Sequence, residues 1–132
     1  MTQYVNINID GMSIEAPKGT SVLDAGLDFG ICIPHLCRVP YVEDIGACRL
    51  CIVEHVVNGH SKITTSCTLH VKEGMVIRSN TDKIIELRRN IAELLVAEAP
   101  NSRAVQDVAK RCGVRDVRYP FHNSNCILCG RC

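Results

Sequence analysis

Nine cysteines in 132 residues constrain this chain more than any other feature of its sequence. Four of them follow the spacing C-x10-C-x2-C-x15-C and are Cys37, Cys48, Cys51 and Cys67. A disulfide framework, a zinc site, a redox dithiol or an iron–sulfur cluster could each use clustered thiols. Structural zinc usually takes two close cysteine pairs, whereas a [2Fe-2S] cluster takes four thiolates and accepts an uneven split. The spacing therefore favours iron–sulfur over zinc without excluding zinc.

The N-terminal sequence bears on the redox compartment. MTQYVNINID has no basic region followed by an apolar one. No apolar run approaches the roughly 18 residues that a membrane span needs. We therefore expect a cytoplasmic protein, in which clustered thiols hold metal more often than they form disulfides. Fifteen basic residues balance fourteen acidic ones and are scattered apart from Arg88 and Arg89, so no nucleic-acid surface is expected.

Residues 1–80 have the pattern strand, strand, helix, loop and three strands. These elements are expected at residues 4–9, 12–16, 22–29, 52–57, 61–66 and 75–78. Asp10-Gly11 and Asn58-Gly59 are hairpin turn signals between alternating apolar runs. Thr20 or Ser21 can cap the helix, and Gly30 ends it. The loop before the third strand contains two prolines and no sustained periodicity, which is typical of a ligand-bearing segment.

From Thr81 the apolar spacing becomes helical. We expect an amphipathic helix over residues 81–99, capped by Thr81 and ended by Pro100, and a shorter helix over residues 102–112 that closes on Gly113. The apolar residues expected at helical spacing are Ile84, Leu87, Ile91, Leu94 and Leu95. Such a helix usually covers the apolar surface of its own fold, and we prefer this to the docking of a partner.

Several motifs resemble one family. GICIPHLC, GACRLCIVE, TSCT and KEGMVI are similar to the N-terminal [2Fe-2S] ferredoxin domain of the large iron–sulfur subunit of respiratory complex I. The same domain recurs in diaphorase subunits of NAD(P)-linked hydrogenases and in formate dehydrogenases, and LRRNIAELLVAEA and VRYPFHNSNCILCGRC also resemble that branch. The resemblance implies an α+β fold: a β-grasp ferredoxin domain at 1–80, a helical extension at 81–113 and a C-terminal tail at 114–132. The [2Fe-2S] ligands that it implies are Cys37, Cys48, Cys51 and Cys67.

The tail contains CILCGRC, which resembles the opening of a [4Fe-4S] ferredoxin module. Cys126, Cys129 and Cys132 supply three thiols, and the bacterial pattern would place a fourth cysteine three residues later. Another ligand, a [3Fe-4S] cluster or a truncated chain would each account for this. His122 is the candidate ligand, since it precedes Cys126 by the interval of the H-x3-C-x2-C-x5-C motif in larger relatives. APNSRAVQDVAKRCG lacks that motif, so its cluster is expected to be missing.

The sequence also allows predictions for four other residues, two cysteines and two residues beside the ligand positions. Cys32 and Cys112 are expected to be small buried residues, because free cysteine is among the most buried residue types. Gly46 is small enough to let backbone N–H groups approach cluster sulfur. Arg49 lies between two ligand positions, where its charge would stabilise a reduced cluster or its stem would cover apolar surface.

The sequence shows no carboxylate pair, nucleophile–base pair, glycine-rich phosphate loop or flavin signature, so no catalytic residue is expected. The resemblance implies a subunit that passes single electrons between a flavoprotein oxidising NAD(P)H and a second redox subunit. The hetero-oligomer would be a cytoplasmic, electron-bifurcating hydrogenase, transhydrogenase or formate dehydrogenase. A zinc-stabilised interaction module and a freely diffusing ferredoxin are the alternatives. The formal charge of +1 argues against the latter, since steering to several partners favours a strongly acidic surface.

Overall fold

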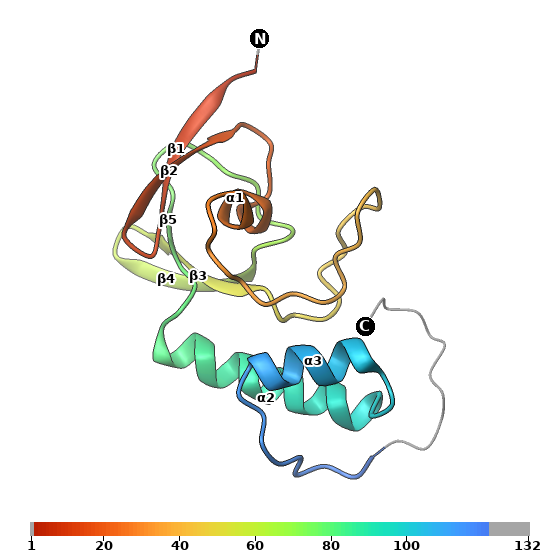
Figure 1. Ribbon diagram of the computed structural model, residues 1–132. Coiled ribbons are helices and arrows are strands. Elements are labelled where there is room, and N and C mark those ends of the chain that lie inside the picture. Colours follow the sequence, from red (N-terminus) through yellow and green to blue (C-terminus); the bar gives the residue numbers. More distant parts are fainter. Residues whose placement is uncertain (1, 122–132) are drawn as a thin grey trace.

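A five-stranded mixed sheet curves around a short helix in the first half of the chain (Figure 1). The computed structural model describes residues 2–121. Its elements here are β1 (Tyr4–Ile9), β2 (Met12–Pro17), α1 (Val22–Asp28), β3 (Ile52–Val57), β4 (His60–Thr65) and β5 (Val76–Arg78). The strand order is β2-β1-β5-β3-β4, with β1 parallel to β5 and the other neighbours antiparallel. This is the arrangement of a β-grasp ferredoxin and confirms the expected α+β class.

The first hairpin forms because alternate residues are apolar and the turn residues accept a positive φ. Val5, Ile7 and Ile9 are buried on the inner face of β1. Asp10 and Gly11 have φ values of 53° and 84°. A two-residue type I′ turn requires a positive φ at both central positions, and Asp-Gly is one of its preferred sequences.

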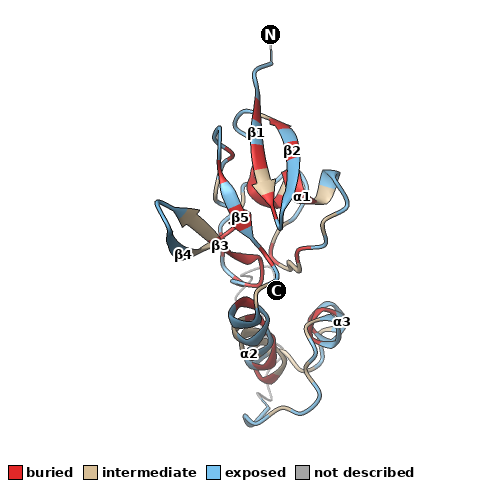
Figure 2. Ribbon diagram, turned by 90° about the vertical axis from the view of Figure 1, so that its left-hand side faces the viewer, coloured by how far each residue is buried: buried red, intermediate tan, exposed pale blue. Residues whose placement is uncertain are grey.

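Helix α1 covers the inner face of the sheet and builds the first core. The Ser21 hydroxyl caps it by accepting a hydrogen bond from the Asp24 N–H at 3.1 Å. Val22 and Leu23 then point inward and are fully buried. They pack with the inner residues of β1, β2 and β5, which Figure 2 shows as buried along the strands. The fold thereby fixes the segments on either side of α1.

Two further helices, α2 (Asp82–Glu98) and α3 (Arg103–Arg111), run antiparallel and lie beside the end of the sheet (Figure 1). Thr81 caps α2, as predicted, by accepting a hydrogen bond from the Ile84 N–H at 3.3 Å. Their inner faces form a second core with residues of the loop between α1 and β3. Its buried members are Cys37, Cys48, Leu50, Ala92, Val108 and Ala109. Helix α2 therefore covers its own fold, as expected.

The inner face of α2 differs from the prediction at one position. Ile84, Arg88 and Ala92 form the buried stripe at i, i+4 spacing, whereas Leu94 is 51% exposed. Leu94 follows Ala92 by two residues, which places it about 200° around the helix from the stripe. The prediction that Leu94 faces inward was therefore wrong, and a charged residue occupies the centre of the stripe.

Among the described residues, no helix has the length and apolar character that crossing a membrane requires.

Candidate functional site

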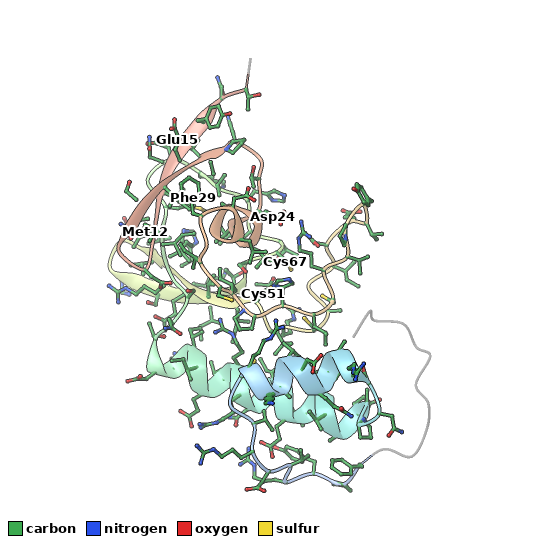
Figure 3. The ribbon with its side chains drawn as sticks, in the orientation of Figure 1. Met12, Glu15, Asp24, Phe29, Cys51 and Cys67 are labelled. Atoms are coloured by element: carbon green, nitrogen blue, oxygen red, sulfur yellow. The ribbon has the colours of Figure 1, made fainter. Side chains whose placement is uncertain are left out.

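The candidate thiols meet where the long loop before β3 approaches the turn after β4. Cys37 and Cys48 lie in the loop, Cys51 directly precedes β3, and Cys67 follows β4. All four are buried, with exposed fractions between 1% and 6%. Figure 3 shows Cys51 and Cys67 close to each other between α1 and the α2–α3 pair. Loop segments that are far apart in the sequence thus bring the four predicted positions together.

The four thiols are organised as two pairs. The Cys37 N–H donates to the Cys48 Sγ at 3.5 Å, and the Cys48 N–H donates to the Cys37 Sγ at 3.5 Å. Cys51 and Cys67 form the other pair, since their side chains hydrogen-bond and their charges interact. Negative charge on Cys37 also raises the pKa of Cys67, so the two pairs lie close enough to interact. The first pair belongs to the second core and the other pair to the first core.

Burial opposes ionisation of these thiols. It raises the pKa of Cys67 to about 12, and negative charge on Cys51 raises this pKa further. Burial is also the main cause of the raised pKa of Cys48, and backbone N–H groups partly offset it. Buried thiolates need positive charge beside them, and a coordinating metal supplies it and deprotonates a thiol outright. These four thiols would therefore ionise together only beside a positive charge, such as that of a coordinated metal.

The pairing distinguishes between a single metal ion and a cluster. Within residues 2–121, no group of three or more His, Cys, Asp or Glu side chains is arranged to hold a metal ion. A structural zinc ion needs four ligands around one point, whereas each iron of a [2Fe-2S] cluster takes two protein ligands. Two adjacent thiol pairs with only sulfur donors fit a [2Fe-2S] cluster.

Gly46 allows the loop to pack against the turn that carries Cys67. Its φ is 61°, and a Cβ at this position would lie 3.3 Å from both Thr65 Oγ1 and Thr68 Cγ2. The two threonine hydroxyls are hydrogen-bonded to each other at 2.5 Å. Both the backbone conformation and the close contacts therefore favour glycine at this position. Arg49 is exposed with a φ of 62°, so of its two expected roles the structure shows only that the side chain lies at the surface.

Sequence reasoning missed Arg88 as a residue of the site. Its side chain is 5% exposed and lies against the chain segment around Cys51. The Nε donates to the Leu50 carbonyl at 2.8 Å, and the Nη2 donates to the Ile52 carbonyl at 2.7 Å. The Nη2 also reaches the Ser79 carbonyl at 3.2 Å. The sequence could have indicated this, because Arg88 lies four residues after Ile84 and four residues before Ala92, on one face of the predicted helix.

The remaining described cysteines are not members of the two pairs. Cys32 is exposed, so the prediction of a buried residue was wrong. The neighbouring Ile33 enters the core, whereas Cys32 faces outward. Cys112 caps the end of α3 and is half-buried against the second core, so it is less buried than expected.

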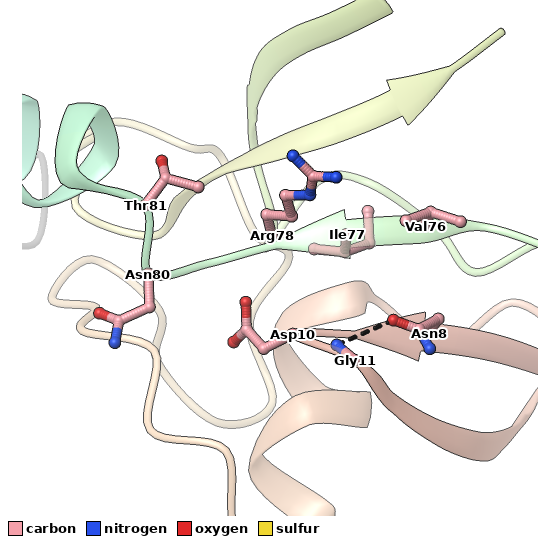
Figure 4. A pocket seen from close by; sticks show the side chains of 8 residues that line it. All are labelled: Asn8, Asp10, Gly11, Val76, Ile77, Arg78, Asn80 and Thr81. Atoms are coloured by element: carbon pink, nitrogen blue, oxygen red, sulfur yellow. Dashed lines mark hydrogen bonds between the residues drawn. The ribbon is translucent and has the colours of Figure 1, made fainter. Parts of the chain in front are cut away.

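A pocket at the turn end of β1 and β5 lies apart from the thiols (Figure 4). Its lining residues are Asn8, Asp10, Gly11, Val76, Ile77, Arg78, Asn80 and Thr81. The Asp10 carboxylate already accepts hydrogen bonds from the Ser79 backbone N–H at 2.7 Å and from the Ser79 hydroxyl. The Asn8 side chain likewise accepts one from the Gly11 N–H. These polar groups stabilise the turn, and we assign them no ligand.

The predicted tail site lies outside the described residues. Its members are His122, Cys126, Cys129 and Cys132.

Comparison with known proteins agrees with this geometry. Residues 2–82 match the family described as the 2Fe-2S iron-sulfur cluster binding domain. The chain is 35% identical over 115 residues to the NADPH-Fe(3+) oxidoreductase subunit alpha of Geobacter sulfurreducens, covering 87% of this chain and 13% of that protein. It is 33% identical over 117 aligned positions to the NADH-ubiquinone oxidoreductase 75 kDa subunit of Reclinomonas americana, covering 89% of this chain and 17% of that protein.

Among solved structures, the chain resembles the NAD+-reducing [NiFe]-hydrogenase in the H2-reduced state, with a TM-score of 0.78 and 32% identity. That match covers 89% of this chain and 52% of the hydrogenase chain. The chain thus spans 13% and 17% of the two curated relatives above. The resemblance inferred from the cysteine motifs is confirmed, and a [2Fe-2S] cluster is the cofactor of this family. The chain belongs to the 2Fe-2S iron-sulfur cluster binding domain family.

Proposed function

We propose that the chain carries single electrons within an NAD(P)-linked oxidoreductase or hydrogenase. The proposed [2Fe-2S] ligands are Cys37, Cys48, Cys51 and Cys67. The observation that carries the proposal is the arrangement of these four buried thiols as two adjacent pairs. When bound, the cluster supplies reversible one-electron chemistry at a thiolate-ligated iron.

The protein's own part is to hold and insulate the site. The backbone N–H groups of Cys37 and Cys48 already point at sulfur, and hydrogen bonds to sulfur are one of the means by which a protein sets a cluster's potential. Burial of all four thiols keeps water away from the ligands. The exposed Arg49 between two of them lies at the surface, where a partner could approach.

The proposed partners are a flavoprotein that oxidises NADH or NADPH and a second redox subunit, in a cytoplasmic hetero-oligomer. Support comes from the names of relatives, which describe NADPH-Fe(3+) and NADH-ubiquinone oxidoreductases and an NADP-reducing hydrogenase. An electron-bifurcating hydrogenase, transhydrogenase or formate dehydrogenase is the more specific form of this proposal. Stoichiometric co-purification with a flavin-containing subunit would support it, and isolation as a free chain would contradict it.

Iron and acid-labile sulfide per chain, with EPR before and after dithionite, test the cofactor and its ligands. The full chain purified without oxygen should contain roughly two irons and one rhombic reduced signal from this site alone. A second cluster held by His122, Cys126, Cys129 and Cys132 would raise the iron to roughly six and add a second signal.

A matched pair of variants identifies the ligands. Cys51→Ala should lose the rhombic signal, because Cys51 is buried in a thiol pair. Cys32→Ala should keep it, because Cys32 is an exposed free thiol outside both pairs. Zinc without iron, even after reconstitution, would contradict the proposed function. Equal loss in both variants would contradict the ligand assignment.

A further inference from the structure

Arg88 carries a buried charge whose hydrogen bonds go to neutral groups. Three of its bonds end on the backbone carbonyls of Leu50, Ile52 and Ser79, at 2.7 to 3.2 Å. A buried charge is costly unless an opposite charge compensates it. Among the described residues, the ion pairs join Arg38 to Asp24 and Arg118 to Glu93, so Arg88 belongs to neither. The fold thus places a buried cation without a bonded carboxylate beside the thiols.

The surroundings of Arg88 indicate where its opposite charge lies. The groups whose negative charge acts on it are Cys112, Cys51 and Asp10. Asp10 has the smallest effect of the three, and its carboxylate accepts hydrogen bonds from the backbone N–H and hydroxyl of Ser79 rather than from Arg88. Cys112 is a half-buried thiol. Burial raises its pKa, so it stays protonated near neutral pH. Cys51 is the one of the three that is a proposed cluster ligand, and as a ligand it would be a thiolate.

We propose that Arg88 positions Cys51 and compensates the charge of the reduced [2Fe-2S] cluster. Its guanidinium holds the carbonyls of the two residues that flank Cys51, so α2 fixes the backbone from which this ligand projects. Uptake of one electron from a one-electron donor adds one negative charge at the site, with no bond formed or broken. A fixed cation nearby lowers the free energy of that state. This inference rests on the proposed function.

Arg88 is buried, whereas Arg49, the other arginine near the proposed ligands, is exposed. Arg49 lies between Cys48 and Cys51 in the sequence, but it is exposed, and water and salt screen its charge. Arg88 acts from the interior, where the effective dielectric constant is lower and the same charge has a larger effect. The guanidinium is also protonated at every working pH. Arg88 is therefore expected to set the potential more strongly than Arg49.

The test is an EPR-monitored redox titration of the full chain, with Arg88→Met, Arg88→Lys and Arg89→Met compared with wild type. Arg89 is the matched control, because it follows Arg88 on α2 and is exposed. Arg88→Met should lower the reduced-to-oxidised ratio at a fixed potential about tenfold, which is about 59 mV for a one-electron couple. Arg88→Lys keeps the charge and should retain most of the potential. Arg89→Met should titrate like wild type.

An Arg88→Met chain that binds the cluster and titrates like wild type would overturn the inference, as would equal shifts in the Met and Lys variants. If Arg88→Met fails to fold, Arg88→Gln replaces it, because glutamine keeps a hydrogen-bond donor without the charge. A gap in potential between the Gln and Lys variants supports charge compensation, and the absence of a gap overturns it. A wild-type chain without iron would instead overturn the proposed function itself.

Discussion

At the scale of single residues, Gly46 shows how closely the ligand loop is packed. It combines a φ of 61° with contacts of 3.3 Å that a Cβ would make to Thr65 and Thr68. Gly46→Ala should therefore lower the free energy of unfolding by more than the backbone cost alone, which is about 1–2 kcal/mol for a left-handed residue. Urea unfolding of the purified chain measures this loss.

Gly59→Ala is the control for the backbone cost. Gly59 has a φ of 77° in the turn between β3 and β4, and a Cβ there would meet nothing within 4 Å. Its alanine variant should lose only the backbone contribution and should keep its iron. Equal losses of stability at the two glycines would show that the loop and the turn with Cys67 can move apart to accept the Cβ at no cost in free energy.

At the scale of the elements, a carboxylate on α2 holds the segment that follows α3. Glu93 accepts hydrogen bonds from the Arg118 backbone N–H at 2.7 Å and from the Arg118 Nε at 2.9 Å. These bonds lower the pKa of Glu93 in the folded state. The pair therefore stabilises the fold above the ordinary glutamate pKa of about 4.3, and this is lost as the pH falls through the lowered value.

Carboxyl NMR of Glu93 against pH tests this contact. In wild type, the Glu93 pKa should lie below its ordinary value, since the hydrogen bonds from Arg118 are the main cause of the shift. Arg118→Met removes the side-chain donors and should raise this pKa. Hydrogen exchange of residues 115–120 should also become faster in the variant. An unchanged titration curve would mean that the segment does not rest on α2 in solution.

The elements were largely predictable because local signals mark their ends. Ser21, Thr81 and Ser102 each cap a helix, and Asp10-Gly11 and Asn58-Gly59 each turn a hairpin. Every helix and strand accordingly lies within one residue of its predicted ends.

The side chains that depend on packing between distant segments were less predictable. Arg88 points inward because three carbonyls from other segments accept its hydrogen bonds, and no local pattern encodes those carbonyls. Cys32 faces outward because its neighbour Ile33 takes the place in the core. Spacing predicted four thiols in one place, but their division into two pairs depends on the path of the folded loop.

At the scale of the whole molecule, the thiol pairs lie in different cores. Cys51 and Cys67 belong to the core under α1, whereas Cys37 and Cys48 belong to the core under α2 and α3. A cluster bound to both pairs would connect the two cores covalently through iron and sulfide. Metal binding would then contribute to folding stability. We therefore expect the apoprotein to lose protection from hydrogen exchange, and to lose it unevenly between the two cores.

Hydrogen exchange with and without iron measures this coupling. Removing the cluster should increase exchange in α2 and α3 more than in the β1–β2 hairpin, because the hairpin packs within the first core alone. A uniform increase along residues 2–121 would instead indicate a single cooperative unit in both states. Full protection of α2 and α3 in the apoprotein would show that their packing does not depend on the cluster.

The second core also determines how much of this chain could be transplanted into another protein. The family match ends at residue 82, yet Cys37 and Cys48 are enclosed by Ala92 on α2 and by residues of α3. A graft that stopped at the end of the match would uncover this thiol pair, and iron bound to it would be open to oxygen and chelators. A portable, air-tolerant version of the proposed electron carrier must therefore include the chain through α3.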